Sequence, residues 1–198
     1  MVERRFAKGD LTFRPVTIDE WPNLQRLFAE KGPQNGCWCM YWRIKRSEWQ
    51  KNFGEENKRA LEEIIQSGRV PGILAYLDGQ PIGWCSIAPR EEFSVLDRSP
   101  TLKRVDGEPV WSIVCFFASK PQRGRGLSQL LIGAAIDYAK ANGARIVEAY
   151  PLDIVNAKYL EGERYMGLIS TFAQAGFKEV ARRSDRRPIM RYYIHRQP

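Results

Sequence analysis

Six consecutive residues have the types and spacing of an anion-binding turn: Arg123, Gly124, Arg125, Gly126, Leu127 and Ser128. They stand just before an apolar helix pattern. The first turn of a helix carries backbone N–H groups without internal partners and a partial positive charge. Glycines beside that turn let a phosphate approach the main chain, and the flanking arginines can pair with it. We therefore predict a ligand that bears a phosphate.

A strand before this turn, and a helix and a strand after it, must position it. Apolar residues run through 110–118, and they recur at intervals of three and four from Leu127 until Asn142 and Gly143 end the pattern. The segment from Arg145 to Pro151 is typical of a second strand. A strand, helix, strand unit normally makes the two strands parallel neighbours.

Two other phosphate sites fit the turn less well. A nucleoside triphosphate loop ends in Gly-Lys-Ser or Gly-Lys-Thr, which this turn lacks. A dinucleotide fingerprint would use Gly124 and Gly126, with Glu148 near the position of a ribose-binding acid. However, Gln129 stands where that fingerprint needs its third glycine, which lets the helix lie close to the strand.

The turn resembles the acyl-CoA-binding motif of the GNAT-type N-acetyltransferase superfamily. That motif is Arg or Gln, two residues, Gly, one residue, then Gly or Ala; Arg123 and Gly126 match it, and Ser128 departs from it but is small. The resemblance extends from about Leu11 to Ile194. It implies an N-terminal extension at 1–10 and one acetyltransferase domain at 11–198.

The resemblance implies an α/β fold with a mixed, mostly antiparallel sheet flanked by helices. In that fold a parallel strand pair splays apart and binds acyl-CoA. By resemblance, acetyl-CoA is the cosubstrate, and its pantetheine arm pairs with the main chain of Phe117 and Ala118. Residues Arg123 to Ser128 would hold the pyrophosphate, and Asn156 would reach the pantetheine amides.

The reaction that the resemblance implies is direct attack of an amine on the thioester. The amine must be neutral, so a base or a water chain must take its proton. Relatives carry a tyrosine acid four residues before a Gly-Phe pair, but here Phe172 precedes Gly176 and Phe177. Candidate acids are therefore Tyr150 and Ser170, with Thr171 and Tyr165 also nearby. The candidate base is Glu108, with Glu148, Glu91 and Glu92 as alternatives that also suit solvated surface charges.

The remaining pattern predicts further elements. Leu11 to Pro15 is a strand, and Thr17 with Glu20 forms a capping box for a helix to about Lys31. After a break at 33–36, a second helix covers 47–66. Strands at 73–77 and 82–87 flank Asp-Gly, the preferred pair for a tight hairpin turn. The segment 90–107 is expected to be an irregular loop on the substrate side.

Length and composition favour a single compact domain. The chain has 198 residues, 43% of them hydrophobic, without a run of about eighteen apolar residues, so we expect no membrane span. A charged N-terminus without a long apolar segment argues against a secretory signal and favours a cytoplasmic location. The four cysteines would then be reduced thiols. We expect no metal, because Cys37 and Cys39 are spaced too closely for a zinc site and His195 is far away.

Two residue groups leave alternatives open. The net charge is +8, and arginines crowd the C-terminal stretch at positions 182, 183, 186, 187, 191 and 196. They suit an acidic partner such as CoA, an anionic substrate or nucleic acid, or else the solvent face of an edge hairpin. The aromatic cluster from Trp38 to Trp49 suits either a stacking wall for the acceptor or helix packing.

The function expected from these features is N-acetylation of a small molecule or a protein amine. The acceptor would be anionic or aromatic, and the protein a monomer or a homodimer. The alternative is a catalytically silent CoA-binding protein that binds an acidic protein or nucleic acid, because Phe172 lacks the usual hydroxyl. A dehydrogenase is a more distant third.

Overall fold

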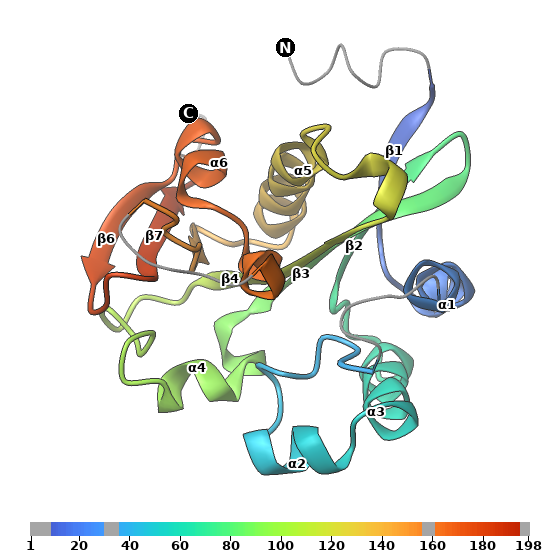
Figure 1. Cartoon of the computed structure of the whole chain (residues 1–198), viewed down its shortest axis with the longest axis horizontal. Helices are drawn as coiled ribbons and strands as arrows, with labels where there is room; N and C mark the ends of the chain where they lie inside the picture. Colours follow the sequence, from blue (N-terminus) through green and yellow to red (C-terminus); the bar gives the residue numbers. More distant parts are fainter. Residues whose placement is uncertain (1–8, 30–35, 156–160, 195–198) are drawn as a thin grey trace.

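A computed structural model of the chain describes residues 9–29, 36–155 and 161–194 (Figure 1). Its strands are β1 Leu11–Pro15, β2 Gly72–Leu77, β3 Gln80–Pro89, β4 Trp111–Ala118, β5 Ile146–Ala149, β6 Lys178–Arg182 and β7 Pro188–Tyr193. Its α-helices are α1 Trp21–Ala29, α2 Arg46–Lys51, α3 Glu55–Gln66, α4 Ser94–Arg98, α5 Leu127–Ala141 and α6 Ile169–Gln174. Short 3-10 helices cover Ile18–Glu20 (η2), Arg90–Glu92 (η4), Lys120–Gln122 (η5) and Glu161–Met166 (η6). Residues 1–8 of the predicted N-terminal extension, and Asn156, lie outside these ranges.

The strands form one mixed sheet in the order β1-β2-β3-β4-β5-β7-β6. In the described chain every neighbouring pair is antiparallel except β4 with β5, which is parallel. That parallel pair flanks α5, so the predicted strand, helix, strand unit is confirmed. The predicted fold class, a mostly antiparallel sheet flanked by helices, is confirmed as well.

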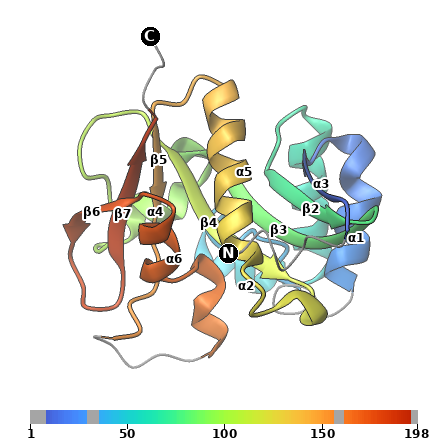
Figure 2. The same cartoon turned by 90° about the horizontal axis from the view of Figure 1, so that it is seen from above.

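Helices cover both faces of the sheet (Figures 1 and 2). Helices α1, α3 and α4 pack their apolar residues on one face together with Trp84, Val114 and Tyr150. Helices α5 and α6 pack on the other face against Ile113 and Val147. Each face therefore has its own hydrophobic core, and β4 contributes to both.

Strand β4 leaves its parallel neighbour early. Its pairing with β5 covers only Trp111 to Ile113, which face Val147 to Ala149. A register shift against β3 adds Val114 as an extra residue, so Cys115 turns toward the face covered by α1. From Val114 to Ala118, β4 therefore presents an edge to which β5 adds no backbone partner.

The hairpin of β2 and β3 and the first strand are confirmed. Asp78 and Gly79 have φ values of 51° and 74°, as a tight turn of this type requires. Strand β1 has the predicted bounds, and α5 ends at Ala141, directly before Asn142 and Gly143, where Gly143 takes a positive φ of 83°. Local sequence signals were sufficient to predict these elements.

Three local predictions are wrong. Thr17 makes no side-chain capping bond, because a 3-10 turn precedes α1 and Glu20 instead accepts hydrogen bonds from Asn23 and from Tyr76 of β2. The helix predicted at 47–66 is two helices, α2 and α3, separated where Gly54 adopts a φ of 101°. The segment 90–107 contains η4 and α4 and is thus only partly irregular.

No helix in the described parts of the chain combines the length and the apolar character needed to cross a membrane.

Candidate active site

A hollow of about 450 Å³ lies at the N-terminal end of α5. Its lining comes from the end of β4, from the predicted turn and from α6, and consists of Ala118, Gln122, Arg123, Gly124, Gly126, Leu127, Ser128, Gln129, Thr171 and Gln174. The size is within the usual range for a small-molecule or cofactor site. Six of the predicted cofactor-binding residues thus share one surface.

The backbone of the turn depends on its glycines. Gly124 and Gly126 have φ values of 73° and 88°, in the left-handed region that other residues rarely adopt. Gly126 directly precedes α5, so the first residues of that helix, Leu127 to Gln129, line the hollow. On the sheet side, a Cβ on Gly83 of β3 would lie 2.6 Å from the Leu127 side chain. Gly83 therefore lets the start of α5 approach the sheet closely.

Both arginines of the turn are exposed and hold the turn to its surroundings. Arg123 donates a hydrogen bond from Nε to the Ala118 carbonyl oxygen at 3.2 Å. Arg125 donates from Nη1 to Oε1 of Gln122 at 3.3 Å. Because these guanidinium groups lie beside the first amides of α5, positive charge gathers at the hollow.

Phe117 and Ala118 end the open edge of β4, but their side chains differ in role. The Phe117 ring packs 5.8 Å from Phe28 of α1 and is buried. Ala118 is half-buried and lines the hollow. The contact predicted for these two residues is through the main chain, where the Ala118 carbonyl oxygen accepts the hydrogen bond from Arg123.

Phe172 is a core residue of α6. Its ring is fully buried and lies 4.9 Å from Phe177 and 5.9 Å from Phe116 of β4. A Cβ on Gly167 would lie 2.8 Å from the same ring. The position at which the resemblance predicts an acid is therefore occupied here by a buried aromatic ring.

The three predicted catalytic residues lie in different places. Ser170 is exposed on the first turn of α6, next to Thr171, which lines the hollow. Glu108 is exposed before the start of β4 and lines a second hollow of about 640 Å³, together with Arg145. The turn follows the opposite end of β4, so the structure does not bring Glu108 to it.

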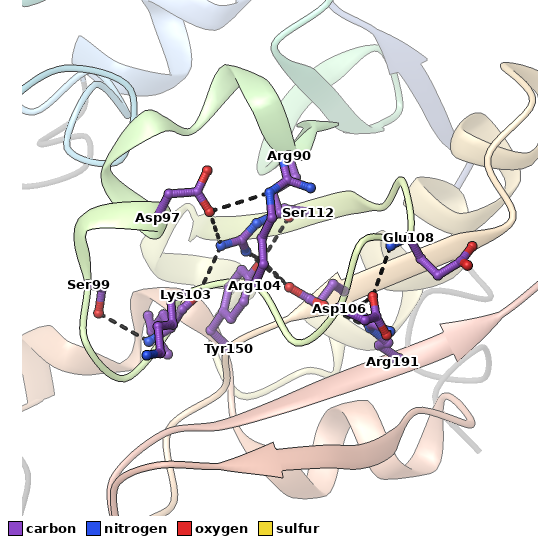
Figure 3. A network of polar contacts seen from close by, with 12 residues as sticks. Arg90, Asp97, Ser99, Lys103, Arg104, Asp106, Glu108, Ser112, Tyr150 and Arg191 are labelled. Atoms are coloured by element: carbon purple, nitrogen blue, oxygen red, sulfur yellow. Dashed lines mark hydrogen bonds and ion pairs between the residues drawn. The ribbon is translucent and has the colours of Figure 1, made fainter.

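Tyr150, the third candidate, belongs to a buried polar network between β4, β5 and η4 (Figure 3). Its hydroxyl lies 2.5 Å from Arg90 Nη1 and 2.8 Å from the Ser112 hydroxyl, and it donates to Glu148 Oε1 at 2.7 Å. Burial and the nearby Glu148 carboxylate raise the pKa of Tyr150. The hydroxyl thus keeps its proton and is committed to protein partners.

The expectation that Glu148 is a surface charge is wrong. Its side chain is 1% exposed and accepts hydrogen bonds from Arg90 Nη1 at 3.1 Å and from Arg191 Nε at 2.8 Å. Arg90 also binds Asp97 of α4, and Arg191 binds Asp106 through both of its Nη atoms. One carboxylate therefore connects the sheet to the segment between η4 and β4, and it faces neither hollow.

The cysteines predicted to be small buried side chains in β3 and β4, Cys85 and Cys115, are confirmed as such. The Sγ atoms of Cys39 and Cys115 are 3.5 Å apart, and Trp84 Nε1 donates to Cys39 Sγ at 3.1 Å. All four cysteines are free thiols and buried. Within residues 9–29, 36–155 and 161–194, no group of three or more His, Cys, Asp or Glu side chains could hold a metal ion.

The arginines of the C-terminal hairpin bind other parts of the protein. Arg182 binds Glu179 and Asp153, and Arg183 donates to the carbonyl oxygens of Lys103 and Arg104. Arg186 binds Glu163, Arg187 donates to the carbonyl oxygens of Tyr150 and Glu163, and Arg191 binds Glu148 and Asp106. These contacts match neither an unoccupied basic patch nor a purely solvated face.

Comparison with known proteins gives a family match over most of the site. The acetyltransferase (GNAT) family matches residues 38–158, which include β4, the turn, α5 and β5. No curated protein matches the sequence.

Several solved structures share the fold. One is PaiA N-acetyltransferase from Thermoplasma acidophilum in complex with coenzyme A, with 14% identity and a TM-score of 0.53 over 93% of this chain and 99% of the other. A mosquito arylalkylamine N-acetyltransferase-like protein has 11% identity and a TM-score of 0.57 over 93% and 100%. The aminoglycoside N-acetyltransferase AAC(6')-Iy in complex with CoA has 18% identity and a TM-score of 0.52 over 96% and 97%.

Proposed function

Because the chain belongs to the acetyltransferase (GNAT) family, we propose that it transfers an acetyl group from acetyl-CoA to an amine. The observation that carries the proposal is the open edge of β4, which leads directly into the hollow at the start of α5. The pantetheine arm would pair with the main chain of Phe117 and Ala118. The pyrophosphate would bind the amides and arginines of residues 123–128.

In this proposal the protein orients the two substrates and the amine attacks directly. The amine nitrogen forms a bond to the acetyl carbonyl carbon, the carbon to sulfur bond breaks, and the amine proton passes to the departing thiolate or to solvent. Of the residues considered as acids, Thr171 lines the hollow and Ser170 precedes it in the chain, whereas Tyr150 is held in its buried network. Four buried thiols fit a reducing, cytoplasmic setting.

Two measurements test the proposal on the purified protein. Acetyl-CoA should raise the unfolding temperature, since a ligand at about a hundred times its Kd stabilises the native state by about 2.7 kcal/mol. A broad panel of amines with acetyl-CoA should release free CoA thiol together with an acetylated amine. Stabilisation without turnover of any amine would instead support a catalytically silent CoA-binding protein, a function favoured by the buried Phe172 ring.

A further inference from the structure

Two tyrosines and two arginines form a wall beside the open edge of β4, on the face opposite α5. We define the tyrosine-arginine wall as Tyr41, Arg46, Tyr165 and Arg187. The rings of Tyr41 and Tyr165 are 6.4 Å apart and nearly perpendicular. The Arg46 guanidinium lies 4.8 Å from the centre of the Tyr41 ring and donates to its hydroxyl, and that of Arg187 lies 5.7 Å from the Tyr165 ring.

The wall stands next to the part of β4 that β5 leaves open. Tyr165 belongs to η6, which packs against β4, and its side chain contacts the core cluster that includes Cys115 and Tyr150. Cys115 follows the bulge of β4 at the point where the strands diverge. A thioester lying along the open edge would therefore end beside Tyr165.

Arg187 connects the residue after β5 to η6. Its Nη1 donates to the carbonyl oxygen of Tyr150, directly after β5, at 3.1 Å, and its Nη2 donates to that of Glu163 in η6 at 2.8 Å. These two partners are neutral carbonyls, and the Glu163 carboxylate, which is bound to Arg186, also attracts the charge of Arg187. Burial lowers the pKa of Arg187, so its charge lies in a poorly solvated place.

The positive charge of the wall arginines would favour acceptors according to their own charge. A carboxylate can bind arginine through charge-assisted hydrogen bonds, whereas a second cation is repelled. Nearby guanidinium groups also lower the pKa of a bound amine, which favours the neutral form that attacks a thioester. The same charges therefore bind an acid and prepare an amine, provided that the acceptor carries both groups.

We propose that the tyrosine-arginine wall binds the acceptor, and that this acceptor is an amine that also carries a carboxylate, as an amino acid does. Arg187 and Arg46 would bind the carboxylate, and the two tyrosines would pack along the acceptor. The inference rests on the proposed acetyltransferase function and names its substrate class. The reaction itself is unchanged: nitrogen bonds to the acetyl carbon and CoA leaves as the thiol.

Matched acceptors test the charge preference. Phenylalanine, phenylalaninamide and phenethylamine share an aromatic side group and a primary amine, but only phenylalanine carries a carboxylate. Aspartate and asparagine, each compared with its α-amide, extend the series to small acceptors. We expect kcat/KM to be at least about tenfold higher for the acids than for their amides, as one charge-assisted contact gives. Equal or faster acetylation of the amides or of phenethylamine overturns the inference.

Variants locate the preference in the wall. R187Q and R46Q should each lower kcat/KM for the acids by about tenfold while leaving the KM for acetyl-CoA unchanged. R183Q is the matched control. Arg183 also donates to two main-chain carbonyls, those of Lys103 and Arg104, but it is not part of the tyrosine-arginine wall. Arg46 is exposed, so R46Q tests the wall even where R187Q fails to fold. An unchanged acid preference in R46Q and in folded R187Q contradicts the assignment.

A binding measurement separates this inference from the proposed function. N-acetylphenylalanine should stabilise the CoA-bound protein against heat more than N-acetylphenylalaninamide does, whether or not turnover is detected. Turnover of amides alone would support the acetyltransferase and overturn the anionic acceptor. Absence of turnover together with selective stabilisation by the acid would overturn the enzyme and support an acid-binding wall, and stabilisation by neither compound overturns the wall.

Discussion

The carboxylate of Glu148 accepts a hydrogen bond from Arg191 Nε at 2.8 Å, and both side chains are almost completely buried. Arg90 approaches the same carboxylate from the other side. Two guanidinium groups thus share one buried acid, and each also binds a second, more exposed acid, Asp97 or Asp106. Buried charges are tolerated only when their partners are in place, which makes this acid important for folding.

Replacing Glu148 by Gln should lower the free energy of unfolding by about 3 kcal/mol, because two buried cations lose the buried acid that they share and keep only the more exposed Asp97 and Asp106. Chemical denaturation followed by circular dichroism measures the change. The control is Glu63→Gln on the exposed side of α3, which should stay within about 0.5 kcal/mol of the unaltered protein. Similar stabilities for the two variants would contradict a buried ionic network.

Stability should fall as the solution becomes acidic. The hydrogen bond from Arg191 lowers the pKa of Asp106 below its ordinary 3.8, although burial acts in the opposite direction. A carboxyl with a lower pKa in the folded state contributes stability above the unfolded pKa and loses it as the pH falls through the folded value. We expect the unfolding temperature to drop below about pH 4 and to drop less in Asp106→Asn. An identical pH profile for the variant would remove Asp106 as a contributor.

Gly126→Val should abolish the thermal stabilisation by acetyl-CoA. A β-branched residue at a φ of 88° strains the turn, and its side chain enters the place where the pyrophosphate would meet the main chain. Gly143→Val is the matched control, because Gly143 has a φ of 83° at the far end of the same helix. Both variants should lose some stability, and only the first should lose the response to acetyl-CoA. A normal response in Gly126→Val would contradict the site.

Phe172→Tyr should destabilise the protein without raising its activity. The added hydroxyl would be buried against the rings of Phe116 and Phe177, which costs about 1–3 kcal/mol. Phe53→Tyr provides a control, because that ring is 45% exposed. A gain in kcat for Phe172→Tyr would show that the missing hydroxyl can still reach the reacting thioester.

The native thiols should react slowly with a chromogenic disulfide reagent. Burial, together with the neighbouring Cys39, raises the pKa of the Cys37 thiol to about 11, and the pKa of Cys85 rises for the same reason. Little thiolate is then present at about pH 8, and the thiolate is the reactive form. All four thiols should react rapidly once denaturant unfolds the chain. Rapid modification of a thiol in the native protein would contradict this packing.

Local sequence predicted the elements whose signals are local. The turn at Gly124 and Gly126, the end of α5 at Gly143 and the Asp78-Gly79 hairpin each depend on a backbone conformation that few residues adopt. The helix break near Gly54 was missed, since the hydrophobic pattern continues across it. The apolar spacing in this region therefore indicates which residues are buried but does not show where one helix ends and the next begins.

The features that sequence did not predict depend on partners far apart in the chain. Glu148 has the sequence context of a surface acid until β5, β7 and η4 place Arg90 and Arg191 beside it. Tyr41 and Arg187 likewise meet in one wall although they come from opposite ends of the sequence. A pattern of burial cannot show which charges will be paired, because pairing is decided by the tertiary fold.

The short pairing of β4 with β5 also affects how a ligand enters and leaves. Beyond Ile113, no β5 hydrogen bond has to break before a main-chain partner can align with the strand. If acyl-CoA pairs with this edge as proposed, each exchange of CoA for acetyl-CoA would leave the hydrogen bonds between β4 and β5 intact.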